Sequence, residues 1–216
     1  MNDATEETAL TLAIGIDEVF SAFAVGRLLS SFAAASPDVH LRVERGSALD
    51  VTACVLDGKI AIGIGLLPRT RAGMECRNLY STNFVAVVPR GHPLSARATV
   101  RLTDLTNEKL VLLTSRHLQR VFFDEELSRQ GLTVKNTLEI SHVDEVLSCV
   151  REGLGLTVLL KEAIHDREHL HKIPVADLTV AHEIGYYLLP GGSNALVESF
   201  IHLVQKTFLK PDADAS

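Results

Sequence analysis

Two glycines beside a helical pattern raise the question of a phosphate-binding loop. The stretch SHVDEVLSCVREGLGLTVL begins at Ser141, and its apolar residues recur at i, i+3, i+4 and i+7 from Val143. A dinucleotide cradle needs its glycines after a strand and before a helix. Here Gly153 and Gly155 end a helix and precede a strand, so they indicate a helix stop. An anion would favour the other end, where Ser141 and Asp144 form a capping-box pattern.

Polar residues follow several predicted strands at their carboxyl ends, where open α/β sheets bind small ligands. Helix N-termini meet the same edge and favour an anion, each by on the order of 0.3–1 kcal/mol. Asp17 and Glu18 add negative charge there, so they are either helix-cap acids or residues that select a ligand with a hydrogen-bond donor. The candidate ligand-binding residues are Asp17, Glu18, Ser47, Ile64, Leu66, Thr114, Ser115, His117, His142 and Val143.

His142 has two interpretations. It lies between a predicted strand and a predicted helix, so it is either a solvated first-turn residue or a side chain that faces the ligand. In the second case its imidazole would hydrogen-bond a hydroxyl or carboxylate of the ligand, beside Thr114, Ser115 and His117. In the first case Ser47, Thr114 and Ser115 would make the polar contacts that select the ligand.

Catalysis and metal binding find little support in the sequence. The chain has no G-x-S-x-G, H-E-x-x-H or P-loop motif, so we predict that it is not an enzyme and uses no cofactor. His165, His169 and His171 place two histidines four residues apart, a spacing that metal sites use. Charged neighbours and the lack of a third ordered ligand favour a solvated loop, so we predict no metal site.

Strand and helix patterns alternate along the chain, which is typical of an α/β fold. The first half predicts strand, helix, strand, helix and strand at residues 10–16, 19–35, 39–43, 46–57 and 60–66. The second half repeats this order at residues 110–115, 116–131, 137–141, 143–150 and 156–160. In both halves a Ser-x-x-Asp pattern precedes the second helix, at Ser47 and at Ser141. The chain is therefore expected to form two similar lobes, each with a parallel sheet.

Two segments with a strand and a Pro/Gly turn, residues 83–94 and 183–194, are predicted to be the crossovers between the lobes. The predicted boundaries are 10–84 plus 188–210 for the first lobe, 85–187 for the second, and 1–9 and 211–216 for flexible tails. Two such lobes joined by two strands enclose a cleft, which is the expected ligand site.

Composition narrows the class of protein. The 216 residues are 46% hydrophobic and carry a formal charge of -6, so the chain can bury a sizeable core and lacks the basic surface of a nucleic-acid binder. Its apolar runs are too short to span a membrane, and its first residues do not resemble a signal peptide. The three cysteines form no C-x-x-C pair. We therefore expect a cytoplasmic protein with reduced thiols, no membrane partner and no DNA binding by this chain alone.

An ordered set of segments resembles the effector-binding domain of LysR-type transcriptional regulators. The set includes SPDVHLRVERGSALD, LDGKIAIGIGLLP, FVAVVPRGHPL and VREGLGLTVLLKEA, and it extends from about Leu10 to Leu209. The resemblance implies a type 2 periplasmic-binding-protein-like fold of two Rossmann-like lobes, with a small-molecule inducer between them. It also implies a homodimer or tetramer that binds DNA only through an N-terminal winged helix-turn-helix, which this chain does not contain before Leu10.

A narrower resemblance concerns the subgroup that responds to salicylate, nitroaromatics or flavonoids. The stretch IGIGLLPRTRAGMECRNLYSTNFVAVVPRGHP is similar to these members, and His117 and His142 sit at similar places to histidines that face their inducers. Asp17 departs from the pattern, because Ser or Thr is common there. The narrower resemblance implies an inducer of aromatic type, while Asp17 argues against a carboxylate on that inducer. The alternative is the solute-binding protein of a transporter, which shares the fold but needs an export signal.

Overall fold

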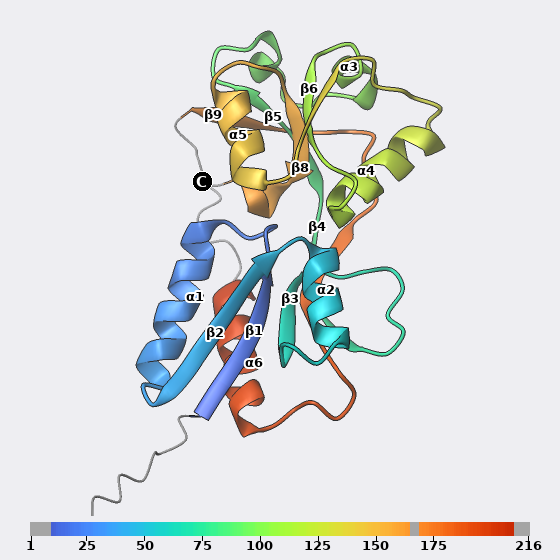
Figure 1. Cartoon of the computed structure of the whole chain (residues 1–216). Coiled ribbons are helices and arrows are strands. Elements are labelled where there is room, and N and C mark those ends of the chain that lie inside the picture. The colour runs from blue at the N-terminus through green and yellow to red at the C-terminus, as the bar shows by residue number, and fades with distance from the viewer. Residues whose placement is uncertain (1–9, 165–168, 210–216) are drawn as a thin grey trace, which may run out of the picture.

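Two α/β lobes lie one above the other and are joined where the chain crosses between them (Figure 1). The computed structural model describes residues 10–164 and 169–209. The predicted tails, 1–9 and 211–216, lie outside the described residues. The alternation of strands and helices along the described chain confirms the predicted α/β class.

The first lobe is built on a five-stranded sheet with the order β2-β1-β3-β10-β4. Its strands are β1 (Leu10–Asp17), β2 (Val39–Gly46), β3 (Ile62–Leu66), β4 (Glu75–Thr82) and β10 (His182–Leu188). β1 is parallel to β2 and β3, whereas β10 is antiparallel to β3 and β4. β3 is buried along its whole length, as expected for an apolar strand at the centre of a covered sheet.

Helices cover both faces of this sheet (Figure 1). They are α1 (Ala22–Ala35) and α6 (Ala195–Phe208) on one face and α2 (Ala48–Leu56) on the other. α1 and α6 meet through an edge-to-face contact of Phe32 and Phe200, whose ring centroids lie 5.4 Å apart. α1 begins later than predicted because Ser21 is its N-cap, and the Ser21 side chain accepts a hydrogen bond from the amide of Ala24.

The second lobe contains a three-stranded sheet with the order β8-β5-β9 and a parallel pair of strands, β6 and β7. β5 is antiparallel to both β8 and β9, so the predicted parallel sheet is wrong for these three strands. The strands are β5 (Phe84–Pro89), β6 (Leu110–Leu113), β7 (Thr137–Ile140), β8 (Thr157–Leu160) and β9 (Leu170–Pro174). A bridge between Leu110 and Leu156 links the pair to the end of β8. The helical segments are η1 (Pro93–Ala96), α3 (Leu102–Leu105), α4 (Leu118–Arg129), α5 (Val143–Arg151) and η2 (Lys161–Ala163).

α5 has the amphipathic pattern that the sequence predicts. Val143, Val146, Leu147 and Val150 are its buried residues and pack into the core of the second lobe. Gly153 follows the helix with a positive φ of 76°, a conformation that glycine adopts without strain. Gly155 precedes β8, where a Cβ would lie 2.4 Å from the carbonyl oxygen of Lys109. The two glycines therefore end a helix and lead into a strand, and they do not form a phosphate-binding loop.

The crossings between the lobes do not coincide with the predicted segments. The first lies at the start of residues 83–94, whereas the second precedes residues 183–194, which were wrongly predicted as a crossover. β4 ends at Thr82 and β5 begins at Phe84, so the chain passes between the lobes at Asn83. It returns between β9 and β10, through residues 175–181. Because β10 forms its hydrogen bonds with β3 and β4, residues 182–187 belong to the first lobe, whereas the predicted boundaries placed them in the second.

An aromatic stack packs against these crossings. His182 lies parallel to Phe122 of α4, with ring centroids 4.7 Å apart, and meets Phe84 edge-on at 4.9 Å. The guanidinium of Arg69 lies 4.9 Å from the centre of the Phe122 ring. Burial, helped by the positive charge of Arg69, lowers the pKa of His182 to about 4. The imidazole is therefore neutral within the stack at physiological pH.

Among the helices of the described residues, none is long and apolar enough to span a membrane.

Candidate functional site

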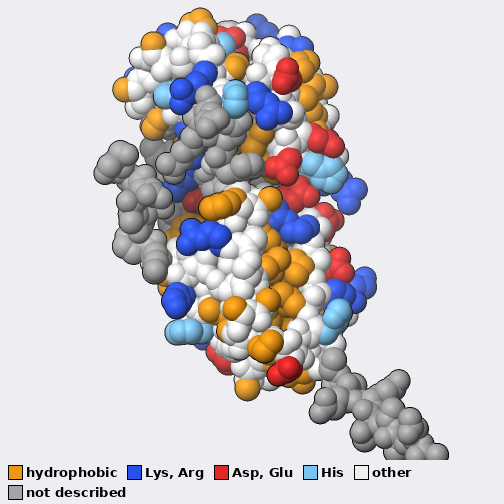
Figure 2. Space-filling view, turned by 90° about the vertical axis from the view of Figure 1, so that its left-hand side faces the viewer, with side chains coloured by type: hydrophobic (Ala, Val, Ile, Leu, Met, Phe, Trp, Pro, Cys, Tyr) orange, Lys and Arg blue, Asp and Glu red, His pale blue; other side chains and the backbone are white. Residues whose placement is uncertain are grey.

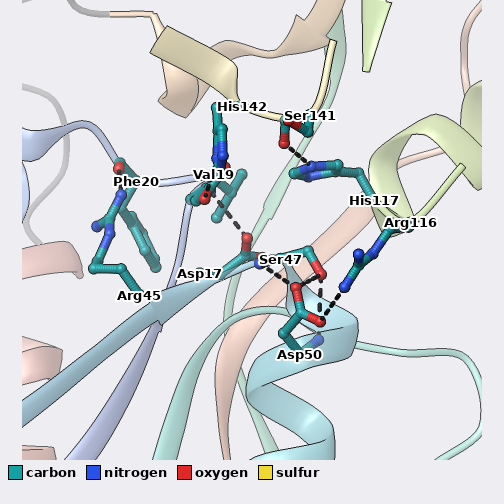
Figure 3. A network of polar contacts seen from close by, with 11 residues as sticks. Asp17, Val19, Phe20, Arg45, Ser47, Asp50, Arg116, His117, Ser141 and His142 are labelled. Carbon is teal, nitrogen blue, oxygen red and sulfur yellow. Dashed lines mark hydrogen bonds and ion pairs between the residues drawn. The ribbon is translucent and has the colours of Figure 1, made fainter. Parts of the chain in front are cut away.

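Asp17 ends β1 and ties two strand ends together. Its carboxylate is buried and accepts a hydrogen bond from the amide of Val19 at 3.0 Å (Figure 3). It accepts a second from the amide of Leu66, also at 3.0 Å. Burial raises the pKa of Asp17 to about 6, although the two backbone hydrogen bonds and Arg45 oppose this shift. Gly65 makes room for the carboxylate, because a Cβ at this position would lie 2.2 Å from the Cβ of Asp17.

Glu18 and His142 form a contact between the lobes. Glu18 follows β1 in the first lobe, and His142 is the N-cap of α5 in the second. Glu18 Oε1 lies 3.2 Å from His142 Nδ1. The second carboxylate oxygen of Glu18, Oε2, is buried and has no hydrogen-bond partner in the described part of the chain. One oxygen of Glu18 is thus engaged across the lobes and the other is unsatisfied.

A cavity of about 240 Å³ adjoins this contact. Its lining comes from both lobes and consists of Glu18, Arg45, His142, Val143, Asp144 and Glu145. The Arg45 guanidinium donates from Nη2 to the carbonyl of Phe20 at 2.9 Å. Burial lowers the pKa of Arg45, while the neighbouring acids oppose that shift. The cavity therefore lies between the carboxyl ends of β1 and β2 and the N-terminus of α5.

Arg116 and Asp50 form a second polar contact between the lobes, where Arg116 Nη2 lies 3.4 Å from Asp50 Oδ1. Asp50 also closes the predicted capping box of α2, since Ser47 Oγ donates to Asp50 Oδ2 at 2.7 Å and accepts from the Asp50 amide at 3.2 Å. The hydrogen bond from Ser47 holds the pKa of Asp50 below its usual range. Figure 2 shows acidic, basic and histidine side chains gathered where the lobes meet on this face.

A model of the family described as LysR substrate binding domain matches residues 5–209, which is most of the chain. The chain belongs to this family. The match confirms the predicted identity as an effector-binding domain of a LysR-type regulator, and with it the predicted fold of two Rossmann-like lobes of the type 2 periplasmic-binding-protein-like kind.

Curated relatives of this LysR domain are transcriptional regulators. It is 28% identical over 150 residues to the uncharacterized HTH-type transcriptional regulator YvbU of Bacillus subtilis, covering 69% of this chain and 50% of YvbU. It is 26% identical over 163 residues to a probable hydrogen peroxide-inducible genes activator of Mycobacterium avium, covering 74% and 52%. The chain thus spans about half the length of the curated relatives it matches.

Solved structures share the fold of this LysR domain at low sequence identity. The regulatory domain of Synechocystis CcmR in complex with 2-PG has a TM-score of 0.83 at 16% identity, with 93% of this chain and 99% of that chain covered. The effector-binding domain of QuiR in complex with shikimate has a TM-score of 0.77 at 14% identity, with 91% and 95% covered. The BenM effector-binding domain with benzoate has a TM-score of 0.75 at 18% identity, with 94% and 96% covered.

The structure brings together only part of the predicted site of this LysR domain. Three predicted residues, Glu18, His142 and Val143, line the cavity. Asp17 is not part of the described lining, and both of its carboxylate oxygens accept hydrogen bonds from backbone amides. The described lining does not include Ser47, Ile64, Leu66, Thr114, Ser115 or His117.

Packing explains why these other residues lie elsewhere. Ile64 and Leu66 are buried in the core of the first lobe, and the Ser47 side chain is used in its capping box. His117 is also buried, and its Nε2 donates to the carbonyl of Ser141 at 2.6 Å. Thr114 is half-buried, with an Oγ1 that has no partner among the described residues, and Ser115 is exposed.

The predicted capping box at Ser141 is wrong. α5 begins at Val143, so its N-cap is His142, whose side chain makes no capping hydrogen bond. The Ser141 carbonyl instead binds the imidazole of His117. The amides of the first turn of α5 are therefore left without a side-chain cap from the N-cap residue, beside the cavity.

Sequence reasoning missed Arg45, Asp144 and Glu145 as cavity residues. Arg45 pairs with Ile16 in the register of β1 and β2, so it reaches the same strand ends as Asp17. Arg45 follows the strand predicted at residues 39–43, and this position could have indicated a cavity residue. His165, part of the histidine cluster considered for a metal, lies outside the described residues. Within the described ranges, no group of three or more His, Cys, Asp or Glu residues is arranged to hold a metal ion.

Proposed function

We propose that the chain is the sensing domain of a longer LysR-type transcriptional regulator, and that it binds a small-molecule inducer in the cavity between its lobes. The observation that carries the proposal is the composition of this cavity. Its lining combines strand-end residues of the first lobe with the N-terminus of α5 in the second. A ligand that contacts both lobes binds best when they are held in one relative orientation, which is how binding becomes a conformational signal.

The solved relatives support a small organic effector, since QuiR and BenM are described with shikimate and benzoate. A cavity of about 240 Å³ fits a ligand smaller than the drug-sized molecules that fill 300–1,000 Å³ pockets. An aromatic inducer remains an expectation from the family resemblance. The described residues that line the cavity include no Phe or Tyr to stack against a ring.

The remaining parts of the proposal concern the whole regulator. We expect a cytoplasmic homodimer or tetramer that binds DNA through an N-terminal winged helix-turn-helix outside this chain. The regulators among its relatives and their greater length support this expectation. The chain alone, with a formal charge of -6, should not bind duplex DNA. Light scattering tests the oligomer, and electrophoretic mobility shifts across a salt series test the lack of DNA binding.

A thermal-shift screen of small metabolites tests the inducer site. A ligand at a hundredfold excess over Kd stabilises the folded chain by about 2.7 kcal/mol, which raises the Tm measurably. Glu145→Trp places a bulky ring in the cavity lining and should abolish the shift. Glu152→Trp, at the other end of α5, is the matched control and should keep it. A ligand whose binding survives Glu145→Trp would place the inducer site elsewhere.

A further inference from the structure

The cavity between the lobes carries an excess of negative charge. Glu18, Asp144 and Glu145 line it, and Arg45 supplies the one guanidinium among the described lining residues. The buried carboxyl of Asp17 adds to this charge, since it acts on Arg45 of the lining. An anionic ligand would bring a further negative charge close to these carboxylates, where partial exclusion of water strengthens the repulsion.

Arg45 is already engaged with protein groups. Its Nη2 donates to the carbonyl of Phe20, and Asp17, Glu18 and Asp144 are the acids that act on its charge. Its positive charge is therefore balanced within the protein before any ligand enters. His142 is a weaker candidate for an anion, because its Nδ1 faces Glu18.

Glu18 offers the unused binding group of the cavity. Its Oε1 is in contact with His142, while its Oε2 is buried and lacks a partner among the described residues. A buried carboxylate oxygen without a donor is unfavourable, so a ligand that supplies a donor there gains affinity. A protonated amine supplies both the missing donor and the missing positive charge.

We infer that the cavity selects an effector that carries a protonated amino group, and that the carboxylate of Glu18 receives this group. The inference rests on the proposed function, because it assigns a ligand class to the same cavity. It separates this chain from QuiR and BenM, whose described ligands, shikimate and benzoate, are carboxylates. Of the two roles that the sequence allows for Glu18, a helix-cap acid or a residue that selects a ligand with a hydrogen-bond donor, the inference favours the second.

The test uses matched sets of probes and the full chain. Each set contains an L-α-amino acid, the amine formed by its decarboxylation and the 2-hydroxy acid that lacks its amino group. Nuclear magnetic resonance follows the amides of Val143, Asp144 and Glu145, and titration calorimetry measures Kd. We expect amino acids or amines to shift these amides and the corresponding hydroxy acids to leave them unchanged. Glu18→Gln should weaken the Kd of an active amine about 10- to 100-fold.

Glu152→Gln is the matched control, since Glu152 is an exposed acid beyond the other end of α5, and it should leave the Kd unchanged. The inference is overturned if hydroxy acids bind these amides as well as amino acids do, a result that would leave the proposed function standing. It is also overturned if Glu18→Gln, folded by circular dichroism, binds amines as tightly as the wild type. If no probe of any class shifts these amides, both the inference and the proposed cavity site fail.

Discussion

The buried carboxyl of Asp17 should make the chain less stable as the pH rises from about 4 to about 6. In the unfolded chain this carboxyl titrates near its ordinary pKa of 3.8, and in the folded chain near 6. Between these two values the folded state holds more protons than the unfolded state. The stabilising contribution of protonated Asp17 is therefore complete below 3.8 and is lost as the pH rises through 6.

The size of this effect follows from the two pKa values. They differ by about two pH units, and each unit corresponds to 1.36 kcal/mol, so the full change is about 3 kcal/mol. Asp17→Asn removes the titration and keeps the size of the side chain. It also turns an amide NH₂ toward the donors of Val19 or Leu66, which costs stability by an amount that does not depend on pH.

Urea unfolding of the wild type and Asp17→Asn at pH values from 4 to 8 isolates this titration. The free energy of unfolding of the wild type, taken relative to the variant, should fall by about 3 kcal/mol between pH 4 and pH 6–7 and then level off. Asp38→Asn, which removes an exposed carboxyl, is the control and should run parallel to the wild type. A relative stability that stays flat or rises with pH would show that the backbone hydrogen bonds and Arg45 outweigh burial.

Three further predictions concern the same scaffold. Ser47→Ala removes the capping box of α2 and should lower the free energy of unfolding by about 0.5–2 kcal/mol in urea titrations, with an unchanged m value. Gly65→Ala forces a methyl group against the Asp17 side chain and should lower the free energy of unfolding by about 3 kcal/mol or more. Gly26→Ala, in open space on α1, should raise it by about 0.5–1 kcal/mol, and thermal unfolding compares the two variants. The wild type should lose about 2–3 kcal/mol of unfolding free energy on acidification, because the neutral imidazole of His182 stabilises the fold above pH 6.5 and this contribution is lost as the pH falls through 4. His182→Phe should remove this loss, and a comparison of the Tm of the two proteins from pH 4 to 7 detects it.

Local patterns predicted those parts of the fold that local forces determine. The period of apolar residues in α5 and the stop at Gly153 are readable because helix formation and termination involve neighbours along the chain. The capping box at Ser47 is predictable for the same reason. At Ser141 the same motif failed, because the Ser141 carbonyl binds His117, which lies 24 residues away in the sequence.

Long-range pairing accounts for the features that were missed. The place of β10 in the first sheet depends on antiparallel pairing with β4, from which it is separated by the whole second lobe. The burial of Asp17 depends on the amide of Leu66, 49 residues away, and on the space that Gly65 leaves. Sequence periodicity contains neither piece of information, so Asp17 was predicted as a ligand contact although its carboxylate is bound to the backbone.

The single-residue crossing at Asn83 links the relative orientation of the lobes to the position of the far end of β1. Because β4 and β10 stay paired as far as Thr82 and His182, and residues 175–177 are hydrogen-bonded to the second lobe, a rotation of one lobe against the other is absorbed by backbone torsions at Asn83 and along residues 178–181. β1 runs from its Asp17 end, beside the cavity, to Leu10 at the far end of the first lobe, a span of about 23 Å at 3.3 Å per residue (Figure 1). A small rotation between the lobes therefore displaces Leu10 by a larger distance than it displaces the residues beside the cavity. Leu10 is the end from which the chain continues toward its N-terminus.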